Sequence, residues 1–507
     1  MKKYMSILMV PVAAMLLGSC SKQLNLAPVS SVSDANYWKN ADQVNAFVTG
    51  IHIQFRRDNT AFLYMGELRA GSFGTDPGSS SAFTGEATQG FENMWNQTLD
   101  ANNPGVRNFG GFYYNINQLN LLIQKIQATS FVAAADKAYY LGIGYGMRAF
   151  YYFQLYRTWG DVIIQTAPVD HIDISNLAKA ADPATEVMKQ IKKDIDSSAA
   201  NFADDYSFRQ QKGFWSKPAT EMLKAEVYLW TAGRKGGSAD ATTALAALND
   251  IQAKVPGLKL LPSYADIFTE KGNDEIIFAS SNNLNESTLS FIGNFVPQAG
   301  LIQNFYDSVQ NMKFDASNNW GGLLRAPTKI STFRQFRDDD ARKWASIQPA
   351  YNKNSDGSYS IAGCFIRKYL GEQNAGSREY TNDFPIYRYA DLLLLKAEAE
   401  ILLGQSPATE INQVRQRAYG NNYKAAVQGY PNQAIDANPK EAVLQERLLE
   451  FLLEGKRWYD LRSMGDQYVF EHTSLRSSEA YKLLWPIDLG ALTNNRSLVQ
   501  NPGYPKF

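Results

Sequence analysis

The segment 444–462 has a clear helical periodicity, and it restricts the fold more than any other stretch of this chain. Its apolar residues recur at helical spacing, and its opposite charges lie three or four residues apart. The apolar set is Leu448, Phe451, Leu452 and Tyr459, and the charge pairs are Arg447/Glu450, Glu454/Arg457 and Lys456/Asp460. The pattern predicts a helix that buries one face and carries ion pairs along another.

Amphipathic helical patterns cover much of the remaining chain. Helices are predicted over residues 42–56, 112–128, 136–159, 183–200, 217–232, 241–254, 388–403, 407–419 and 439–464. Residues 261–385 differ, because they combine loops rich in Asn, Ser and Gly with strand candidates at 275–280 and 364–369. The sequence therefore predicts a mainly α fold with a few short strands.

Two helical segments repeat a short motif. Leu223-Lys224-Ala225-Glu226 returns as Leu395-Lys396-Ala397-Glu398, and a glycine follows each copy at Gly233 and Gly404. Small Ala149, Ala225 and Ala397 inside bulky helices would let a neighbouring helix approach closely. We therefore expect paired helices of the tetratricopeptide kind, although the period is too irregular to prove true repeats.

The N-terminus has the layout of a lipoprotein signal. Lys2 and Lys3 precede an apolar run from Met5 to Leu17, which is too short for a stable membrane span, and Gly18-Ser19-Cys20 follows. We expect residues 1–19 to be cleaved, Cys20 to carry acyl chains, and residues 20–40 to form a tether. An ordinary cleaved signal peptide with an incidental cysteine is the alternative.

Cysteine count and charge exclude other classes. After acylation of Cys20 only Cys364 remains, so no intramolecular disulfide can form and stability must come from core burial. The chain has 50 basic and 50 acidic residues and no basic stripe, which argues against a nucleic-acid partner.

Several motifs, taken in order, resemble the SusD/RagB family of nutrient-binding lipoproteins of Bacteroidetes. They are Gly66-Glu67-Leu68-Arg69, residues 148–156 with Trp159-Gly160-Asp161-Val162, Pro385-Ile386-Tyr387-Arg388-Tyr389-Ala390-Asp391 with Ala397-Glu398-Ala399, the 444–462 segment, Leu484-Trp485-Pro486-Ile487 and Gln500-Asn501-Pro502-Gly503-Tyr504. The resemblance covers nearly the whole chain.

This resemblance implies a fold and a role. It implies one SusD-like domain over 41–507, with a tetratricopeptide-like helical scaffold at about 41–260 and 386–507 and an irregular, loop-rich subdomain at about 261–385. It also implies a surface glycan-binding protein, lipid-anchored in the outer membrane and facing the cell exterior. Its partner would be a SusC-like TonB-dependent transporter.

The sequence contains no recognisable set of catalytic residues. The three histidines His52, His171 and His472 are far apart and lack metal-ligand spacing, so we expect neither a metal nor a cofactor. Glu446, Glu450 and Glu454 sit among basic residues, and we interpret them as structural ion-pair partners. We expect no enzyme; a glycosidase with dispersed carboxylates and a peptide-binding member of the same scaffold are the alternatives.

Aromatic residues beside amides are the candidate ligand contacts, because a sugar offers an apolar C–H face and a polar rim. The leading candidates are Trp95 with Asn96, and Trp320 with Asn319; Tyr306, Phe295 and Arg69 rank lower. The alternative for each tryptophan is an anchor that packs a loop on the core. We expect Trp159, Trp230, Trp458 and Trp485 to be core residues.

Overall fold

A computed structural model describes residues 37–76, 89–107, 109–169, 178–309, 311–315 and 320–506. The predicted signal segment, Cys20 with its lipid, most of the tether, His171 and Asn319 lie outside this part of the chain. None of the helices in the described part combines the length and apolar composition needed to cross a membrane.

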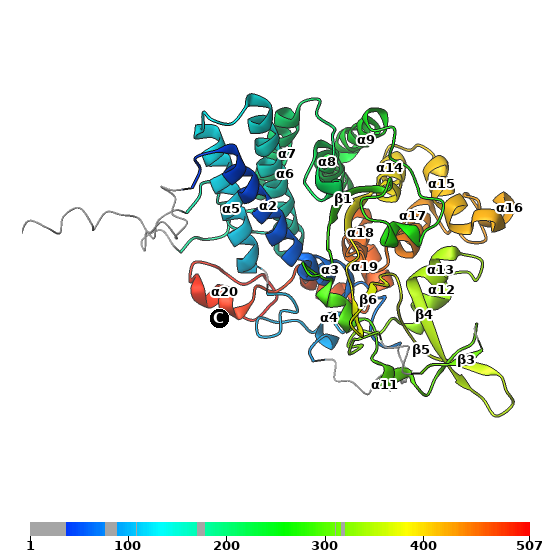
Figure 1. The fold of residues 1–507 in the computed structure, drawn as a ribbon. Helices are drawn as coiled ribbons and strands as arrows, with labels where there is room; N and C mark the ends of the chain where they lie inside the picture. Colours follow the sequence, from blue (N-terminus) through cyan, green and yellow to red (C-terminus); the bar gives the residue numbers. More distant parts are fainter. Residues whose placement is uncertain are drawn as a thin grey trace, which may run out of the picture.

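The protein is mainly α-helical, as predicted, and its long helices pack on one another in sequence order (Figure 1). α5 packs on α6, α6 on α7 and α8 on α9, while α14 lies against α9, α15 and α17. The helices are α2 (Ala41–Arg57), α3 (Asn59–Glu67), α4 (Glu92–Trp95), α5 (Phe109–Ala128), α6 (Ala134–Trp159), α7 (Ala184–Phe202), α8 (Lys217–Thr231), α9 (Gly237–Lys254), α10 (Asp266–Thr269), α11 (Ala299–Ile302), α12 (Ile330–Gln335), α13 (Ala341–Ser346), α14 (Tyr389–Leu402), α15 (Ala408–Tyr419), α16 (Ala425–Gln428), α17 (Pro439–Phe451), α18 (Arg457–Met464), α19 (Asp466–His472) and α20 (Leu489–Asn494).

Local sequence explains where these helices begin. The side chain of Asn40 accepts a hydrogen bond from the backbone N–H of Gln43 and caps α2, and Ser216 caps α8 in the same way. Pro218 stands in the first turn of α8, where its missing N–H has no intrahelical partner to lose. Ala149, Ala225 and Ala397 are fully buried, as close packing of a neighbouring helix would require.

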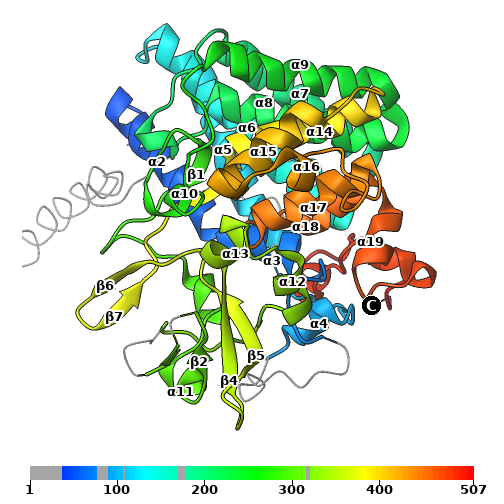
Figure 2. The same cartoon turned by 90° about the vertical axis from the view of Figure 1, so that its right-hand side faces the viewer.

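The irregular subdomain adds strands, of which β2, β4, β5, β6 and β7 lie below the long helices in Figure 2, whereas β1 lies beside α2. Their bounds are β1 (Ile276–Ser280), β2 (Tyr306–Asp307), β3 (Met312–Lys313), β4 (Ile347–Lys353), β5 (Tyr359–Ile366), β6 (Glu372–Asn374), β7 (Ser377–Glu379) and β8 (Phe384–Arg388). Antiparallel sheets form in the orders β3-β2-β4-β5, β6-β7 and β1-β8. The last pair ties the subdomain to the helical scaffold, because β8 runs directly into α14.

The prediction of one continuous helix over 439–464 is wrong. α17 ends at Phe451, and α18 begins at Arg457. Between them Leu453 and Gly455 adopt left-handed backbone angles, with φ of 61° and 74°. Gly455 also lies so close to α3 that a Cβ on Gly66 would stand 1.7 Å from the Gly455 carbonyl oxygen. The turn therefore needs glycine at both positions.

A second correction concerns the charges of this segment. They are buried, and their partners come from distant parts of the chain instead of from the same helix. Arg447 pairs with Asp391 and Asp460, and Lys456 pairs with Asp391. Glu454 pairs with Lys368 and Arg388 instead of with Arg457, because a turn and not a continuous helix separates Glu454 from Arg457.

A buried ion network surrounds Glu450 and Glu454. The Glu450 carboxylate accepts from Arg388 at 2.6 Å, from Arg342 at 3.3 Å and from Arg417. Glu454 accepts from Lys368 at 2.6 Å and from Arg388 at 2.9 Å, and Glu275 bridges Arg388 and Arg417. We use the term buried ion network for Glu275, Arg342, Lys368, Arg388, Arg417, Glu450 and Glu454. It joins α17 to β8, α13, α15 and the segments that flank β1 and β5.

Burial alone would raise the pKa of the Glu450 carboxyl, but the guanidinium groups of Arg417, Arg388 and Arg342 hold it well below its ordinary value. The carboxylate is therefore ionised at every physiological pH. Its role as a structural ion-pair partner, predicted from sequence, is confirmed.

The first prediction concerns this network. Glu450→Gln keeps the side-chain shape but leaves three buried guanidinium groups short of one anion, so the free energy of unfolding should fall by about 3–5 kcal/mol. Glu186→Gln is the matched control, because Glu186 and Lys189 form an exposed pair and should contribute about 0–1 kcal/mol. Urea unfolding monitored by circular dichroism measures both. Equal losses in the two variants would contradict the central position of Glu450.

His52 is a buried histidine held in one tautomer. Its Nδ1–H donates to the Val48 carbonyl at 2.8 Å, and its Nε2 accepts from the Trp215 backbone N–H at 2.9 Å. Burial lowers the pKa of His52 to about 4, although the Val48 carbonyl acts in the opposite direction. Protonation would also remove the acceptor that Trp215 uses.

The second prediction follows from this lowered pKa. The unfolded chain binds a proton at His52 near pH 6.5 and the folded chain near pH 4, so stability is full above pH 6.5 and falls as the pH drops. His52→Gln cannot titrate there. Between pH 7.5 and 4.5 the wild type should lose roughly 2–3 kcal/mol more unfolding free energy than the variant. If urea titrations show the same loss of unfolding free energy in the wild type and in the variant, the pKa of His52 is not lowered in the folded protein.

Candidate functional site

A surface pocket of about 180 Å³ lies beside α4, in the neighbourhood where sequence placed Trp95 and Asn96. The α3 helix supplies Tyr64, and the short α4 with its preceding turn supplies Phe91 and Asn93. The loop after α4 supplies Asn102, Asn103, Pro104, Gly105 and Arg107, and Gln89 and Gly90 complete the rim together with Met94.

Local contacts hold this pocket in shape. Asp100 accepts hydrogen bonds at 2.8 Å from the backbone N–H groups of Asn102 and Asn103, which fixes the loop. Gly105 has a φ of 73°, and a Cβ there would lie 2.9 Å from Met94, so glycine lets the loop pack on α4. The amide side chains of Asn102 and Asn103 are exposed. The loop thus presents amide groups from a fixed backbone.

The floor of the pocket is aromatic. Phe91 is half-buried and meets the buried Tyr64 edge to face, with ring centroids 5.3 Å apart. Asn294 donates to the Tyr64 hydroxyl oxygen at 2.8 Å. Burial raises the pKa of Tyr64 to about 12, so the hydroxyl keeps its proton and can donate at neutral pH. An apolar ring with amides, a guanidinium and a phenol around it suits a ligand with one apolar face and many hydroxyls.

Trp95 and Asn96 lie next to this pocket in sequence but are not among the described residues that line it. Trp95 belongs to α4 instead of the predicted loop, and only 9% of its surface is exposed. A Cβ on Gly74 would lie 2.8 Å from the Trp95 ring, so the Gly74 backbone covers one face of that ring. The backbone carbonyl of Trp95 accepts a hydrogen bond from Ser474 Oγ at 2.6 Å. Asn96 is exposed next to Trp95. A ligand contact by Trp95 stays a prediction.

Trp320 is half-buried in another cluster. Its ring lies 5.5 Å from that of Phe365, and the Arg378 guanidinium stands 4.9 Å from its centre. Its carbonyl accepts from the Tyr380 hydroxyl. Trp320 is not among the described residues that line the pocket beside α4. Its role as a sugar platform also stays a prediction.

The lower-ranked candidates have different surroundings. Tyr306 is half-buried in β2, with its ring 5.9 Å from that of Tyr359. Phe295 is fully buried between Tyr64 and Phe73. Arg69 is 1% exposed and lies over the rings of Trp458 and Trp485 at 4.3 and 5.2 Å. The last two side chains therefore offer no surface to a ligand in this structure.

Sequence analysis missed Phe91 and the loop amides. Phe91 lies one helical turn before Trp95, and the stretch 89–103 is rich in Asn and Gln. That cluster of amides around two aromatic residues is the signal that would have found the pocket. The sequence cluster does not indicate which of the two aromatic rings is accessible to solvent.

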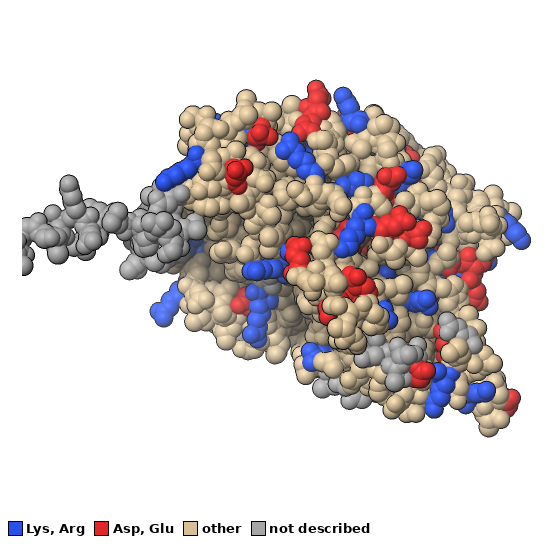
Figure 3. All heavy atoms as spheres, in the orientation of Figure 1, with Lys and Arg blue, Asp and Glu red and all other residues tan. Residues whose placement is uncertain are grey.

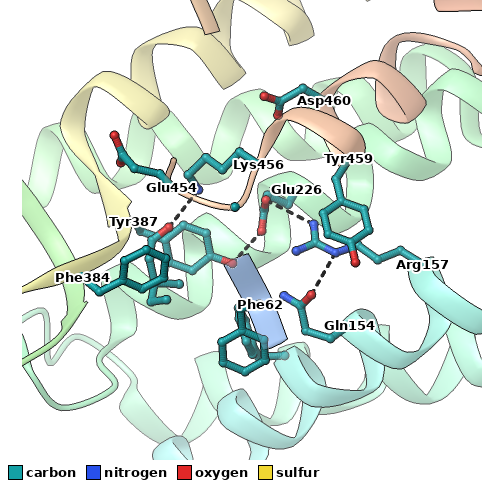
Figure 4. Close-up of a pocket in the computed structure, with 13 residues that line it drawn as sticks. Phe62, Gln154, Arg157, Glu226, Phe384, Tyr387, Glu454, Lys456, Tyr459 and Asp460 are labelled. Atoms are coloured by element: carbon teal, nitrogen blue, oxygen red, sulfur yellow. Dashed lines mark hydrogen bonds and ion pairs between the residues drawn. The ribbon is translucent and has the colours of Figure 1, made fainter. Parts of the chain in front are cut away.

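The interior contains a small cavity between α3, α6, α8, β8 and α18 (Figure 4). It measures about 30 Å³ and holds an ion-pair chain, in which Glu226 accepts from Tyr387 at 2.6 Å and lies 3.6 Å from Arg157. This volume suits a single water molecule and is too small for a sugar. Glu446, Glu450 and Glu454 are each at most 4% exposed, so they are not placed to act on a substrate.

Two further features lie at the surface. Glu441, Glu471 and His472 lie close together, with His472 Nε2 3.1 Å from both carboxylate oxygens of Glu441, but nothing else there points to an ion. Acidic and basic side chains are interspersed on the face that Figure 3 shows, without a broad field of one sign. This agrees with the charge balance of the sequence.

The structure thus defines a scaffold of helical pairs that carries loop-built pockets. Comparisons with known proteins identify the family to which this scaffold belongs. The model of the SusD family matches residues 328–504. The structure of B. fragilis NanU has a TM-score of 0.86 and 42% sequence identity, and the match covers 95% of this chain and all of that one. A SusD superfamily protein from Bacteroides vulgatus has a TM-score of 0.84 and 40% identity, over 92% of this chain and all of that one.

The "Starch-binding protein SusD" of Bacteroides thetaiotaomicron is 24% identical over 395 residues, which are 65% of this chain and 67% of that protein. The chain belongs to the SusD family. The resemblance noted from sequence motifs is therefore confirmed, together with the helical-pair fold that it implied.

Proposed function

We propose that this protein is a nonenzymatic, lipid-anchored glycan-binding protein of the outer membrane. Its glycan would bind in the pocket beside α4. The observation that carries the proposal is the half-buried ring of Phe91 within a rim of amides. Aromatic rings stack on the apolar faces of sugars, and amides bind their hydroxyls in both directions. Family membership supports it, because a relative is named a starch-binding protein.

The proposal includes a place and a partner. The signal segment that ends at Cys20 supports attachment to a membrane through acyl chains. The outer membrane, with the domain facing the cell exterior, is the location that the family implies. Captured oligosaccharide would pass to a SusC-like TonB-dependent transporter, a partner that the family implies. Binding near the transporter mouth raises the local ligand concentration, which is useful even when a single site is weak.

The third prediction tests the pocket. A glycan array first selects a ligand, and calorimetric titration then measures its affinity. Phe91→Ala should weaken binding about tenfold or more, because a central aromatic anchor often contributes about 2 kcal/mol. Phe131→Ala, which truncates an exposed ring outside the pocket, should leave affinity unchanged.

The same titration is applied to variants of Trp95 and Trp320, the two tryptophans that sequence predicted to contact the ligand. Trp95→Ala should lower the melting temperature, because the ring is buried against the Gly74 backbone. A loss of affinity in the same variant would identify Trp95 as a ligand contact. Trp320→Ala weakens binding only if the ligand spans from α4 to the β4–β5 sheet. Unaltered affinity in Phe91→Ala and Trp95→Ala together would remove the glycan site from this pocket.

The fourth prediction tests the anchor. Cys20→Ala removes the thiol that would be acylated, so the protein should move from the membrane fraction to the soluble fraction. Immunoblots after fractionation of cells that express each form measure the distribution. Ser19→Ala is the matched control and should remain with the membrane. A Cys20→Ala protein that stays fully membrane-bound would show that another feature holds it there.

A further inference from the structure

We propose that the carboxyl groups of Glu400 and Glu410 share one proton and act as a pH-sensitive clamp between α14 and α15. Glu400 lies in the last turn of α14, and Glu410 lies in the first turn of α15. The two helices pack on each other and lie side by side in Figures 1 and 2. Neither glutamate lines the pocket beside α4, so the clamp is separate from the proposed glycan site.

Two carboxylate oxygens in this helical pair lack an ordinary hydrogen-bond donor. Glu400 Oε2 and Glu410 Oε2 are both buried, and none of the described residues donates an N–H or side-chain O–H group to either atom. The two carboxyl groups instead hydrogen-bond to each other. Ionised carboxylates only accept hydrogen bonds, so this contact requires a proton on one of the two groups.

The charges around the two glutamates are balanced by one proton. Lys396 lies one turn before Glu400, and its Nζ stands 3.5 Å from Glu410 Oε1. The same ammonium donates to Gln252 Oε1 of α9 at 2.7 Å, and Gln252 donates to the Tyr389 hydroxyl oxygen. Two carboxylates beside one ammonium leave one negative charge without a partner, which a single proton neutralises. A divalent cation in that place would instead be repelled by the Lys396 ammonium.

This environment moves the titration of Glu400 into the neutral to alkaline range. Burial and the contact with Glu410 raise the pKa of Glu400 to about 8, although the Lys396 ammonium acts in the opposite direction. The unfolded chain loses the same proton near pH 4.5. The protonated pair therefore contributes its full stability below pH 4.5 and loses it as the pH rises through 8.

The loss is expected to be local, because buried ion pairs hold the other end of α15. Arg415 pairs with Asp436 and Glu446, and Arg417 belongs to the buried ion network. These arginines lie in the C-terminal half of the helix. Repulsion between two ionised carboxylates would thus loosen the first turn of α15 and the connection 403–407 before it affects the rest of the scaffold.

The fifth prediction compares the wild type with Glu400→Gln by urea unfolding between pH 5.5 and 9. The amide carries a permanent N–H donor toward Glu410 and cannot titrate, so it imitates the protonated carboxyl. Relative to the variant, the folding equilibrium constant of the wild type should fall roughly 10- to 100-fold across this range. Each pKa unit corresponds to about a factor of ten, and solvent screens part of the effect at a half-buried group.

Other groups titrate in the same range but are identical in both proteins. Burial raises the pKa of Glu67 to about 8 and that of Glu398 to about 7. Their contributions cancel in the comparison. Glu186→Gln is the matched control, because it replaces a carboxylate in the exposed pair with Lys189 and should follow the wild-type pH profile.

Glu410→Gln is the reciprocal variant. If one proton serves both groups, this replacement should remove the alkaline loss to the same extent, whatever its effect on stability at pH 5.5. The double variant with glutamine at both positions should then gain no further resistance to alkaline pH. Glu410→Gln also decides the matter if Glu400→Gln does not fold.

Hydrogen exchange locates the change in the chain. After correction for the intrinsic pH dependence of amide exchange, peptides that cover 403–412 should lose protection at pH 9 in the wild type but not in Glu400→Gln. Peptides from α17 should keep their protection in both proteins.

Three results would overturn the proposal. The first is the same pH profile of stability in the wild type and in Glu400→Gln, which would show that no proton is shared. The second is equal protection of 403–412 at pH 9 in both proteins. The third is a wild-type protein that EDTA destabilises at pH 8.5 and Ca²⁺ restores, which would put a cation in the place of the proton.

Discussion

The buried ion network around Glu450 is the constraint on which the arrangement of this protein depends. Taking each charge out of water costs several kcal/mol, and only partners in good geometry offset that cost. Glu450 and Glu454 on one side and Arg342, Lys368, Arg388 and Arg417 on the other satisfy this condition only when helices and irregular subdomain meet in one way. The network therefore fixes which segments meet, while apolar burial supplies most of the stability.

Periodicity predicted most helices, because a helix that buries one face must repeat its apolar residues every three or four positions. Periodicity gave a wrong prediction at 452–456, because the apolar residues keep their helical spacing there although the chain forms a turn. The turn depends on Gly455 meeting Gly66, and on Glu67, whose carboxylate accepts from the backbone of Leu453 and Gly455 at 3.1 and 3.2 Å. Such a contact joins residues almost four hundred positions apart, and spacing within one segment cannot reveal it.

The candidate site was predicted only in part. Amides next to aromatic residues identified the neighbourhood of α4, because that chemistry is local in sequence. Which ring reaches the surface was not predictable, since the Gly74 backbone covers Trp95 whereas Phe91 is only half-buried. Phe295 and Arg69 have suitable side chains, but partners from elsewhere in the fold enclose them. Exposure is a property of the assembled chain, and composition alone does not determine it.

The break between α17 and α18 has a consequence for how such a scaffold can diversify. It sends the acidic side chains of one segment inward, toward cations from four other parts of the chain, so each of those segments is constrained by the others. The loops that line the pockets donate no cation to that network and have no part in this constraint. The side chains of residues 89–107 can therefore change while the interior keeps its charges paired.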